Sequence, residues 1–247
     1  MKFFTVGGHG ENSFEGEYFV KKETSKHESD AYKYIKENDP ELYAYLPKYI
    51  KSENNKSYFE NLLCKFKSNE KNLVILDLKL GKYSYIPKES CSHDEYCDCD
   101  KTYDDKVDTI DQDFLTEEEK TTKIITKPRF MEWRDISTPT REYGVRLVNL
   151  DAPKKHTIEY LTDYLKEKLK IANISLIQYK LLNIFEALFE SKFFKTHKMI
   201  GVSALIITNG DLCDVKLIDF AKTKQEEKPD NESILSGLMK IVTILNE

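Results

Sequence analysis

Two tracts of this 247-residue sequence place charged side chains at the ends of apolar runs, where they could do chemistry. Asp77 and Lys79 follow the apolar run 73–76, and strand alternation puts both on one face of the strand that this run predicts. Gly81 lets another backbone segment approach the end of that strand. Such a pair is often only a structural ion pair, but it also suits a site that binds a polyanion and a hydroxyl group.

The second tract, 216–223 (KLIDFAKT), is a predicted strand that ends in Asp219, a position that suits a metal-binding carboxylate. Nearer the N-terminus, a predicted strand ends in Lys22, and Glu28 follows six residues later on a predicted helix. Residues 6–10 (VGGHG) predict a glycine-rich turn that could cover phosphates. Transfer of a γ-phosphoryl group needs a lysine on the ATP phosphates, a carboxylate on Mg²⁺ and cations that spread the developing charge. The sequence offers each of these groups.

With these residues the chain resembles the inositol polyphosphate kinase family. The family motif is Pro-x-x-x-Asp-x-Lys-x-Gly; Asp77, Lys79 and Gly81 match it, and Leu73 stands in place of the proline. This departure concerns how the strand begins and leaves the chemical groups intact.

Further tracts are most similar to the catalytic domain of inositol 1,4,5-trisphosphate 3-kinases. Residues 116–120 and 127–135 (KPRFMEWRD) resemble the signature of its substrate-binding part, and 203–205 (SAL) resembles the family's Ser-Leu-Leu motif. The similarity runs from about residue 7 to the C-terminus. A catalytic domain without an upstream calmodulin-binding segment is therefore the expectation.

The resemblance implies an α+β, two-lobed kinase-like fold, related to ATP-grasp proteins and protein kinases, with a small inserted inositol-phosphate-binding subdomain. We expect an N-terminal lobe at 1–63, a C-terminal lobe at 64–247 and the insertion at 82–135, which looks too polar to contribute a core. Apolar residues at helical spacing between 157 and 197, and again from 231 to 245, predict helices that pack on the second lobe.

Roles for individual residues also follow from the resemblance. Lys22 would hold the ATP phosphates and Glu28 would orient it, while the backbone groups of Glu60 and Leu62 would pair with adenine. Asp77 would bind the ribose hydroxyls of ATP or, alternatively, accept the proton of the attacking hydroxyl. Lys79 would take part in catalysis and bind the substrate. Asp219 and Ser203 would bind Mg²⁺ (or Mn²⁺), and Asp219 would thereby also contribute to ATP binding and catalysis.

Lys127 and Arg134 match family residues that bind substrate phosphates, whereas Arg129, Arg141 and Arg146 are weaker candidates. Two departures reduce the positive charge around the expected pocket. Residues 90–100 are acidic where the 3-kinases carry arginines, and Asp151 replaces a lysine; Lys101 or the pair Lys154 and Lys155 could compensate. Inositol 1,4,5-trisphosphate with relaxed specificity is the expected substrate; an inositol hexakisphosphate kinase that makes a pyrophosphate and an inositol polyphosphate multikinase are the alternatives.

The acidic stretch also offers four possible zinc ligands, at Cys91, His93, Cys97 and Cys99. Their spacing is tighter than that of most structural zinc sites, and a loop with free thiols is the simpler interpretation.

Composition agrees with an intracellular enzyme. The net charge of −5 argues against a nucleic-acid-binding protein, and no apolar run is long enough to span a bilayer. Five cysteines, an odd number, fit reduced thiols, so we expect a cytoplasmic or nuclear location. We also expect a monomer. A hypothesis of a different class is an inactive relative that only binds inositol phosphates, and a protein kinase is disfavoured because no His-Arg-Asp tract precedes Asp219.

Overall fold

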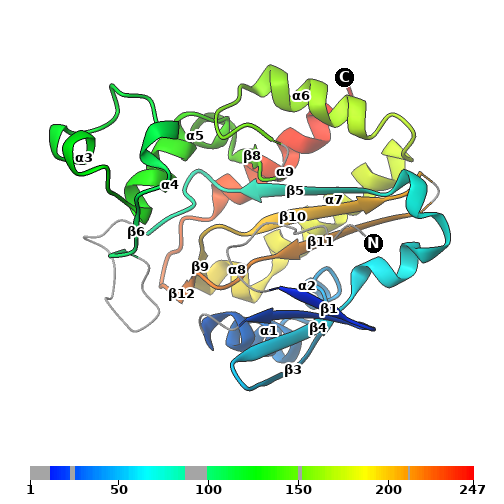
Figure 1. The fold of residues 1–247 in the computed structure, drawn as a ribbon. Helices are drawn as coiled ribbons and strands as arrows, with labels where there is room; N and C mark the ends of the chain where they lie inside the picture. Colours follow the sequence, from blue (N-terminus) through cyan, green and yellow to red (C-terminus); the bar gives the residue numbers. More distant parts are fainter. Residues whose placement is uncertain (1–11, 23–25, 87–98, 150–151, 211) are drawn as a thin grey trace.

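The computed structural model describes residues 12–22, 26–86, 99–149, 152–210 and 212–247. The glycine-rich tract 6–10 lies outside these residues. Two four-stranded antiparallel sheets dominate the described part of the fold, one from residues 13–60 and the other from residues 74–218 (Figure 1). The overall arrangement is the α+β, two-lobed one that the sequence predicts.

The N-terminal sheet has the strand order β1-β2-β4-β3. Its strands are β1 (Ser13–Glu15), β2 (Tyr18–Lys22), β3 (Tyr49–Glu53) and β4 (Lys56–Glu60). Helices α1 (Lys26–Asn38) and α2 (Pro40–Tyr43) connect β2 to β3. Asn54 and Asn55 both have a positive φ, 52° and 57°, which a tight two-residue turn between β3 and β4 requires and asparagine tolerates. The Tyr32 ring of α1 packs on Phe59 of β4, with 4.9 Å between the ring centroids, and fixes the helix on the sheet.

A 3₁₀ segment, η1 (Leu62–Asn72), leads into the second sheet, whose strand order is β11-β10-β5-β8. These strands are β5 (Val74–Leu80), β8 (Val145–Leu147), β10 (Ser203–Thr208) and β11 (Cys213–Ile218). Alternate residues of β5 take different faces: Leu76, Leu78 and Leu80 join the hydrophobic core, so Asp77 and Lys79 lie on the opposite face.

Helices α7 (Ile174–Glu190) and α9 (Glu232–Ile244) pack on the core face of the second sheet (Figure 1). Helices α6 (Ile158–Lys168) and the short α8 (Lys192–Thr196) add side chains to the same core. A small two-stranded sheet pairs β9 (His197–Met199) with β12 (Thr223–Gln225). Most positions predicted at helical spacing are buried, among them Leu165, Leu181 and Leu238, while Ile158, Phe185 and Leu245 are partly buried.

Close backbone contacts fix the end of β5. The N–H of Gly81 donates to the carbonyl of Gly144 at 2.9 Å, and a Cβ on Gly237 of α9 would collide with that same carbonyl. Gly144 itself has φ +69°, a conformation that glycine adopts without strain. Glycine at these positions therefore holds α9, the turn before β8 and the strand that carries Asp77 and Lys79 in one arrangement.

The segment between β5 and β8 forms a small subdomain. It contains β6 (Thr102–Tyr103), the 3₁₀ turn η3 (Val107–Thr109), α3 (Glu117–Thr122), β7 (Ile125–Thr126), α4 (Lys127–Ile136) and α5 (Thr140–Tyr143). The expectation that this insertion contributes no core is wrong, because it has a separate hydrophobic core of Val107, Ile110, Leu115, Ile125, Phe130 and Trp133. Helix α5 of the insertion also contacts α9 of the larger domain.

One hydrophobic core extends through both sheets, from Tyr32 and Phe59 to Leu165 and Ile241. The predicted boundary between residues 63 and 64 therefore separates two sheets that share a core. Within the described residues, no helix combines the length and the hydropathy that a bilayer-spanning segment requires.

Candidate active site

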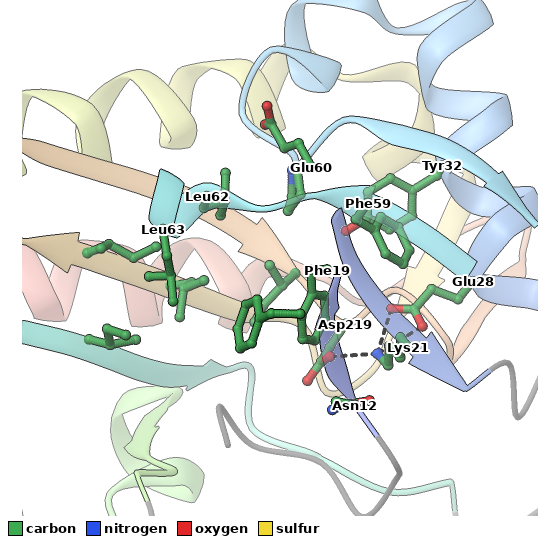
Figure 2. A pocket seen from close by; sticks show the side chains of 16 residues that line it. Asn12, Phe19, Lys21, Glu28, Tyr32, Phe59, Glu60, Leu62, Leu63 and Asp219 are labelled. Carbon is green, nitrogen blue, oxygen red and sulfur yellow. Dashed lines mark hydrogen bonds and ion pairs between the residues drawn. The ribbon is translucent and has the colours of Figure 1, made fainter. Parts of the chain in front are cut away.

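An apolar pocket lies between the two sheets, at the start of β5 (Figure 2). Its walls are formed by apolar side chains from both lobes: Phe14, Phe19, Phe59, Leu62, Leu63, Ile75, Leu205, Ile207 and Ile218. Lys21, Glu28 and Asp219 line one end of the pocket together, and Glu60 lines it away from this group (Figure 2). The pocket can therefore hold a flat apolar ring with an anionic group at its charged end.

Four charged side chains form a chain of ion pairs at that end. Lys21 Nζ lies 2.9 Å from Glu28 Oε2 and 3.1 Å from Asp219 Oδ1. Lys79 Nζ lies 2.9 Å from the other Asp219 oxygen, Oδ2, and donates a second hydrogen bond to the Gly201 carbonyl at 2.7 Å. Each oxygen of Asp219 thus accepts from a different lysine, one from each sheet.

These contacts shift the pKa values of both partners. Burial would raise the pKa of Asp219, but the charges of Lys79 and Lys21 outweigh it and hold that pKa well below its usual range. Burial would likewise lower the pKa of Lys21, whereas Glu28 and Asp219 together raise it. Asp219 therefore stays ionised and Lys21 stays charged across the physiological range.

The expected role of Lys22 as the partner of Glu28 is wrong. Lys22 is exposed at the end of β2, while Lys21 shares a strand face with Phe19, and both line the pocket. Successive strand residues point to opposite faces, so a shift of one residue moves the ammonium group from the pocket to solvent. Lys22 was assigned from its six-residue separation from Glu28. Strand alternation, which puts Lys21 on the same face as the apolar Phe19, was the signal that could have identified Lys21 instead.

Asp77 and Ser203 share the pocket-side face of the second sheet, since Ser203 pairs with Lys79 and Leu205 pairs with Asp77 in the strand register. Asp77 is only 2% exposed and Ser203 is fully buried, yet neither carboxylate oxygen of Asp77 nor Ser203 Oγ has a partner within hydrogen-bond geometry among the described residues, although Ser203 is near enough to oppose the rise in the pKa of Asp77. Burial raises the pKa of Asp77, with Lys79 opposing the shift. Buried polar atoms are normally paired, so these three mark the place where a polar ligand belongs.

Asp219 follows β11 with φ +68°, an uncommon conformation for a residue other than glycine. Ser203 pairs with Ile218, the residue just before Asp219, which brings the serine next to the carboxylate. The donor set is all oxygen, and the orphaned Ser203 hydroxyl is the kind of ligand that Mg²⁺ prefers. No three His, Cys, Asp or Glu groups converge as a metal site in the part of the chain that the structure describes, so a metal here would need ligand phosphates and water as well.

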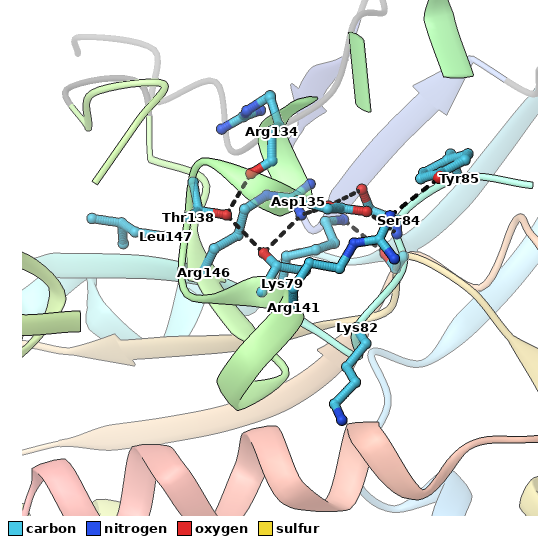
Figure 3. A network of polar contacts seen from close by, with 12 residues as sticks. Lys79, Lys82, Ser84, Tyr85, Arg134, Asp135, Thr138, Arg141, Arg146 and Leu147 are labelled. Atoms are coloured by element: carbon cyan, nitrogen blue, oxygen red, sulfur yellow. Dashed lines mark hydrogen bonds and ion pairs between the residues drawn. The ribbon is translucent and has the colours of Figure 1, made fainter. Parts of the chain in front are cut away.

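Beyond Lys79, a buried network joins the insertion to the second sheet (Figure 3). Asp135 of α4 accepts hydrogen bonds from Arg146 of β8 and from Ser84, whose N–H and hydroxyl lie 2.9 and 2.7 Å away. Arg146 is opposite Lys79 in the β5–β8 register, and its Nε and Nη2 have no hydrogen-bond partner in the part of the chain that the structure describes. The network fixes α4 relative to the strand that carries Lys79.

Fixing α4 also places Arg134, whose Nε is buried and has no hydrogen-bond partner within the described ranges. Burial and the nearby charge of Arg146 lower the pKa of Arg134 to about 10, so the guanidinium stays charged at neutral pH. Lys127, at the start of α4, is two helical turns before Arg134, so both cations lie on one face of the helix. Lys101, Lys106 and Lys154 add to this group of positive charges. The sequence pointed to Lys101 and Lys154 but missed Lys106, which no motif marks.

The weaker arginine candidates have structural partners. Arg129 binds Glu119 and Glu132 and stacks on the Phe114 ring, and Arg141 stacks on Tyr83. Arg146 is fully buried in the network described above. The suggested zinc ligands Cys91, His93 and Cys97 lie outside the described residues, and Cys99 is buried with its Sγ 3.8 Å from Asp100 Oδ2.

Comparison with known proteins identifies the class of this fold and site. The family model for inositol polyphosphate kinases matches residues 56–178 and 151–246. Human inositol-trisphosphate 3-kinase B is 31% identical over 84% of this chain, and the Caenorhabditis elegans inositol-trisphosphate 3-kinase homolog is 30% identical over 79%. The chain belongs to the inositol polyphosphate kinase family. It spans 24% and 42% of the lengths of these two relatives.

Solved structures show the same fold. The crystal structure of inositol phosphate multikinase Ipk2 from S. cerevisiae, in complex with ADP and Mn²⁺, superposes with a TM-score of 0.63 at 18% identity, covering 94% of this chain and 98% of that one. A second inositol phosphate multikinase structure gives a TM-score of 0.57 at 15% identity, over 89% of this chain and 98% of that one.

Proposed function

We propose that this protein is an ATP-dependent inositol phosphate kinase. The observation that carries the proposal is the ion-pair chain from Glu28 through Lys21 and Asp219 to Lys79, located where an apolar pocket meets a group of cations. Phosphoryl transfer depends mainly on positioning and on charge stabilisation, and these groups supply both.

The pocket face of β5 supports an orientation for ATP. Ile75, Asp77 and Lys79 are successive residues on that face, about 6.6 Å apart along the strand. Ile75 would contact adenine, Asp77 would bind the ribose and Lys79 would reach the transferring phosphoryl group. The two unpaired oxygens of Asp77 match the two vicinal ribose hydroxyls, which favours the ribose role over that of a base.

Adenine would form hydrogen bonds with the backbone of the segment that connects the two sheets. The N–H of Glu60 already donates to the Lys48 carbonyl at 2.9 Å, so the Glu60 carbonyl and the Leu62 N–H are the groups we assign to the base. Lys21 and Lys79 would bind the phosphates. Asp219 and Ser203 would hold Mg²⁺ or Mn²⁺, which when bound would neutralise phosphate charge.

The substrate would lie between Lys79 and the cations of the insertion, with Lys127 and Arg134 on its phosphates. We propose inositol 1,4,5-trisphosphate as a substrate, attacked through its 3-hydroxyl, with activity on more highly phosphorylated inositols. A pocket with few fixed donors leaves few of them unpaired when another isomer binds, so discrimination is weak.

A panel of inositol phosphates assayed with ATP and Mg²⁺ tests this proposal. We expect turnover of inositol 1,4,5-trisphosphate together with slower turnover of other inositol polyphosphates. Exclusive turnover of inositol hexakisphosphate would instead identify a pyrophosphate-forming kinase, and broad turnover at equal rates a multikinase. Binding without any turnover would identify an inactive inositol-phosphate-binding relative.

A further inference from the structure

One asparagine side chain continues the pairing of β5 where the neighbouring strand stops. Strand β8 pairs with residues 78–80 of β5 and ends at Leu147. Two residues later, Asn149 Oδ1 accepts from the N–H of Asp77 at 2.9 Å, and Asn149 Nδ2 donates to the carbonyl of Ile75 at 2.7 Å. The side-chain amide thus supplies one acceptor and one donor in the places that a main-chain peptide group of a longer β8 would take.

Both main-chain polar groups of Asp77 are held from this side of β5. The N–H of Val148 donates to the Asp77 carbonyl at 2.9 Å, and Asn149 accepts from the Asp77 N–H. The backbone of Asn149 is itself fixed, because its carbonyl accepts from the N–H of Ala152 at 3.0 Å. Two consecutive residues after β8 therefore hold the main chain of Asp77 in place.

The direction of the Asp77 carboxylate depends on this main chain. Neither of its oxygens has a partner within hydrogen-bond geometry among the described residues, so no side-chain contact there restrains it. The carboxylate then takes its position from the Cα–Cβ bond, which the held N–H and carbonyl groups orient. The same amide holds the carbonyl of Ile75, a residue that lines the apolar pocket. Asn149 thus supports two successive residues on the pocket face of β5.

Asparagine suits this position because its two partners are of opposite kinds. The Asp77 N–H needs an acceptor and the Ile75 carbonyl needs a donor, and a side-chain amide carries both. An aspartate would offer acceptors alone and an alanine would offer neither. Either substitution leaves at least one of these main-chain groups without its present partner, which costs free energy and loosens the strand beside Asp77.

We propose that Asn149 is a positioning residue for nucleotide binding, which acts through Asp77 by fixing the strand from which the carboxylate reaches the ribose. The inference rests on the proposed function, in which Asp77 binds the ribose hydroxyls. It adds to that function a residue that no sequence motif marks and that contributes by shaping the main chain.

A double-mutant cycle between Asn149 and Asp77 tests the proposal. Steady-state kinetics with ATP and the inositol phosphate that wild type turns over fastest would compare wild type, Asn149→Ala, Asp77→Ala and the double variant. Asn149→Ala should raise KM for ATP about fivefold or more, and should leave kcat and KM for the inositol phosphate within about twofold of wild type. In the Asp77→Ala background the same substitution should change KM for ATP by less than about twofold, because the carboxylate that Asn149 positions is gone.

Asn173→Ala is a matched control, since it also removes a side-chain hydrogen bond to the main chain. Asn173 Oδ1 accepts from the N–H of Leu176 at 3.0 Å at the start of α7, outside the pocket. This variant should leave both KM values unchanged. Thermal unfolding shows which variants are folded. If Asn149→Ala is not, Asn149→Gln replaces it in the cycle, because its amide is one methylene too far from the main chain to keep both hydrogen bonds.

A comparison of ATP with 2′-deoxy-ATP gives a readout that a merely structural role would not move. Wild type should prefer ATP, and Asn149→Ala should lose most of that preference. An unchanged preference, or the same rise in KM for ATP with and without the Asp77 carboxylate, would overturn the positioning role while the kinase assignment survives. If wild type phosphorylates no inositol phosphate, the proposed function falls and this inference falls with it.

Discussion

Lys21 and Asp219 lie 3.1 Å apart, Nζ to Oδ1, although 198 positions separate them in the sequence. Lys21 comes from the N-terminal sheet and Asp219 follows the last strand of the second sheet, so this contact joins the two lobes at the charged end of the pocket. Because Lys79 binds the other oxygen of Asp219, the nucleotide and metal that we propose would have to draw the two lysines away from Asp219 and onto the phosphates. The ion-pair chain is therefore a preorganised but exchangeable set of charges.

Lys21→Met should abolish most of the activity, whereas Lys22→Met should not. Loss of one preorganised cation at a transferring phosphoryl group should lower kcat by about 10²–10³-fold. Lys22 is exposed and faces away from the pocket, so kcat should stay within about twofold of wild type. Kinase assays on both variants, with circular dichroism to confirm folding, check the prediction. Equal losses, or the reverse order, would return the role to Lys22.

Asp77→Asn should raise KM for ATP with little change in KM for the inositol phosphate. The carboxylate is assigned to two ribose hydroxyls, and an amide offers only one acceptor oxygen. Assays of both proteins with ATP and with 2′-deoxy-ATP give a double-mutant cycle. Wild type should bind 2′-deoxy-ATP more weakly than ATP, whereas Asp77→Asn should bind the two nucleotides with similar affinity. A large fall in kcat with unchanged KM for ATP would favour the alternative role as a base.

The same substitution should stabilise the protein without nucleotide. Burial raises the pKa of Asp77 above its unfolded value of about 3.9, so the folded state holds the proton more tightly. The stability of wild type relative to Asp77→Asn should therefore fall as pH rises from about 4 through the raised pKa.

Urea unfolding of both proteins from pH 4 to pH 8 measures this difference in the free energy of unfolding. In thermal unfolding at pH 7, each kcal/mol by which Asp77→Asn is more stable should raise its Tm by about 2–4 °C. A difference that is flat with pH would mean that Asp77 ionises without cost in the folded protein.

Arg146→Ala and Asp135→Ala should each destabilise the protein by about 3–5 kcal/mol, because either one leaves the charge of its partner buried without the opposite charge of the ion pair. The apolar double variant Asp135→Leu with Arg146→Met leaves no unpaired charge and should recover much of that loss. Denaturant unfolding of the three variants decides the point. Single variants as stable as wild type would show that this network does not fix α4.

Much of the site was visible in the sequence because it rests on short-range patterns. An apolar run followed by Asp77 and Lys79 predicts a strand with both charges on one face, and the register with Ser203 agrees. Asp219 follows a second strand in the same way. In such segments the period of two decides which side chains face the site.

The features of the site that the sequence did not predict depend on tertiary contacts or on a one-residue difference in strand register. Lys21 and Lys22 differ by one position, and only the shared face with Phe19 separates them. The Asp135–Arg146 pair joins a helix to a strand across a buried interface, and nothing local marks it. The core of the insertion was missed because its apolar residues are sparse and become a cluster only after β6, β7 and α4 meet.

The most direct test of the central claim is the transfer of ³²P from [γ-³²P]ATP to inositol 1,4,5-trisphosphate by wild type and by Asp219→Asn. The account predicts a labelled product with wild type, dependent on Mg²⁺ or Mn²⁺, and a rate at least about 10²-fold lower for the variant, whose amide is a poor metal ligand. Wild-type turnover by Asp219→Asn with unchanged metal dependence would contradict the assignment of Asp219. The absence of any labelled inositol phosphate with wild type, across the inositol phosphate panel, would contradict the kinase function itself.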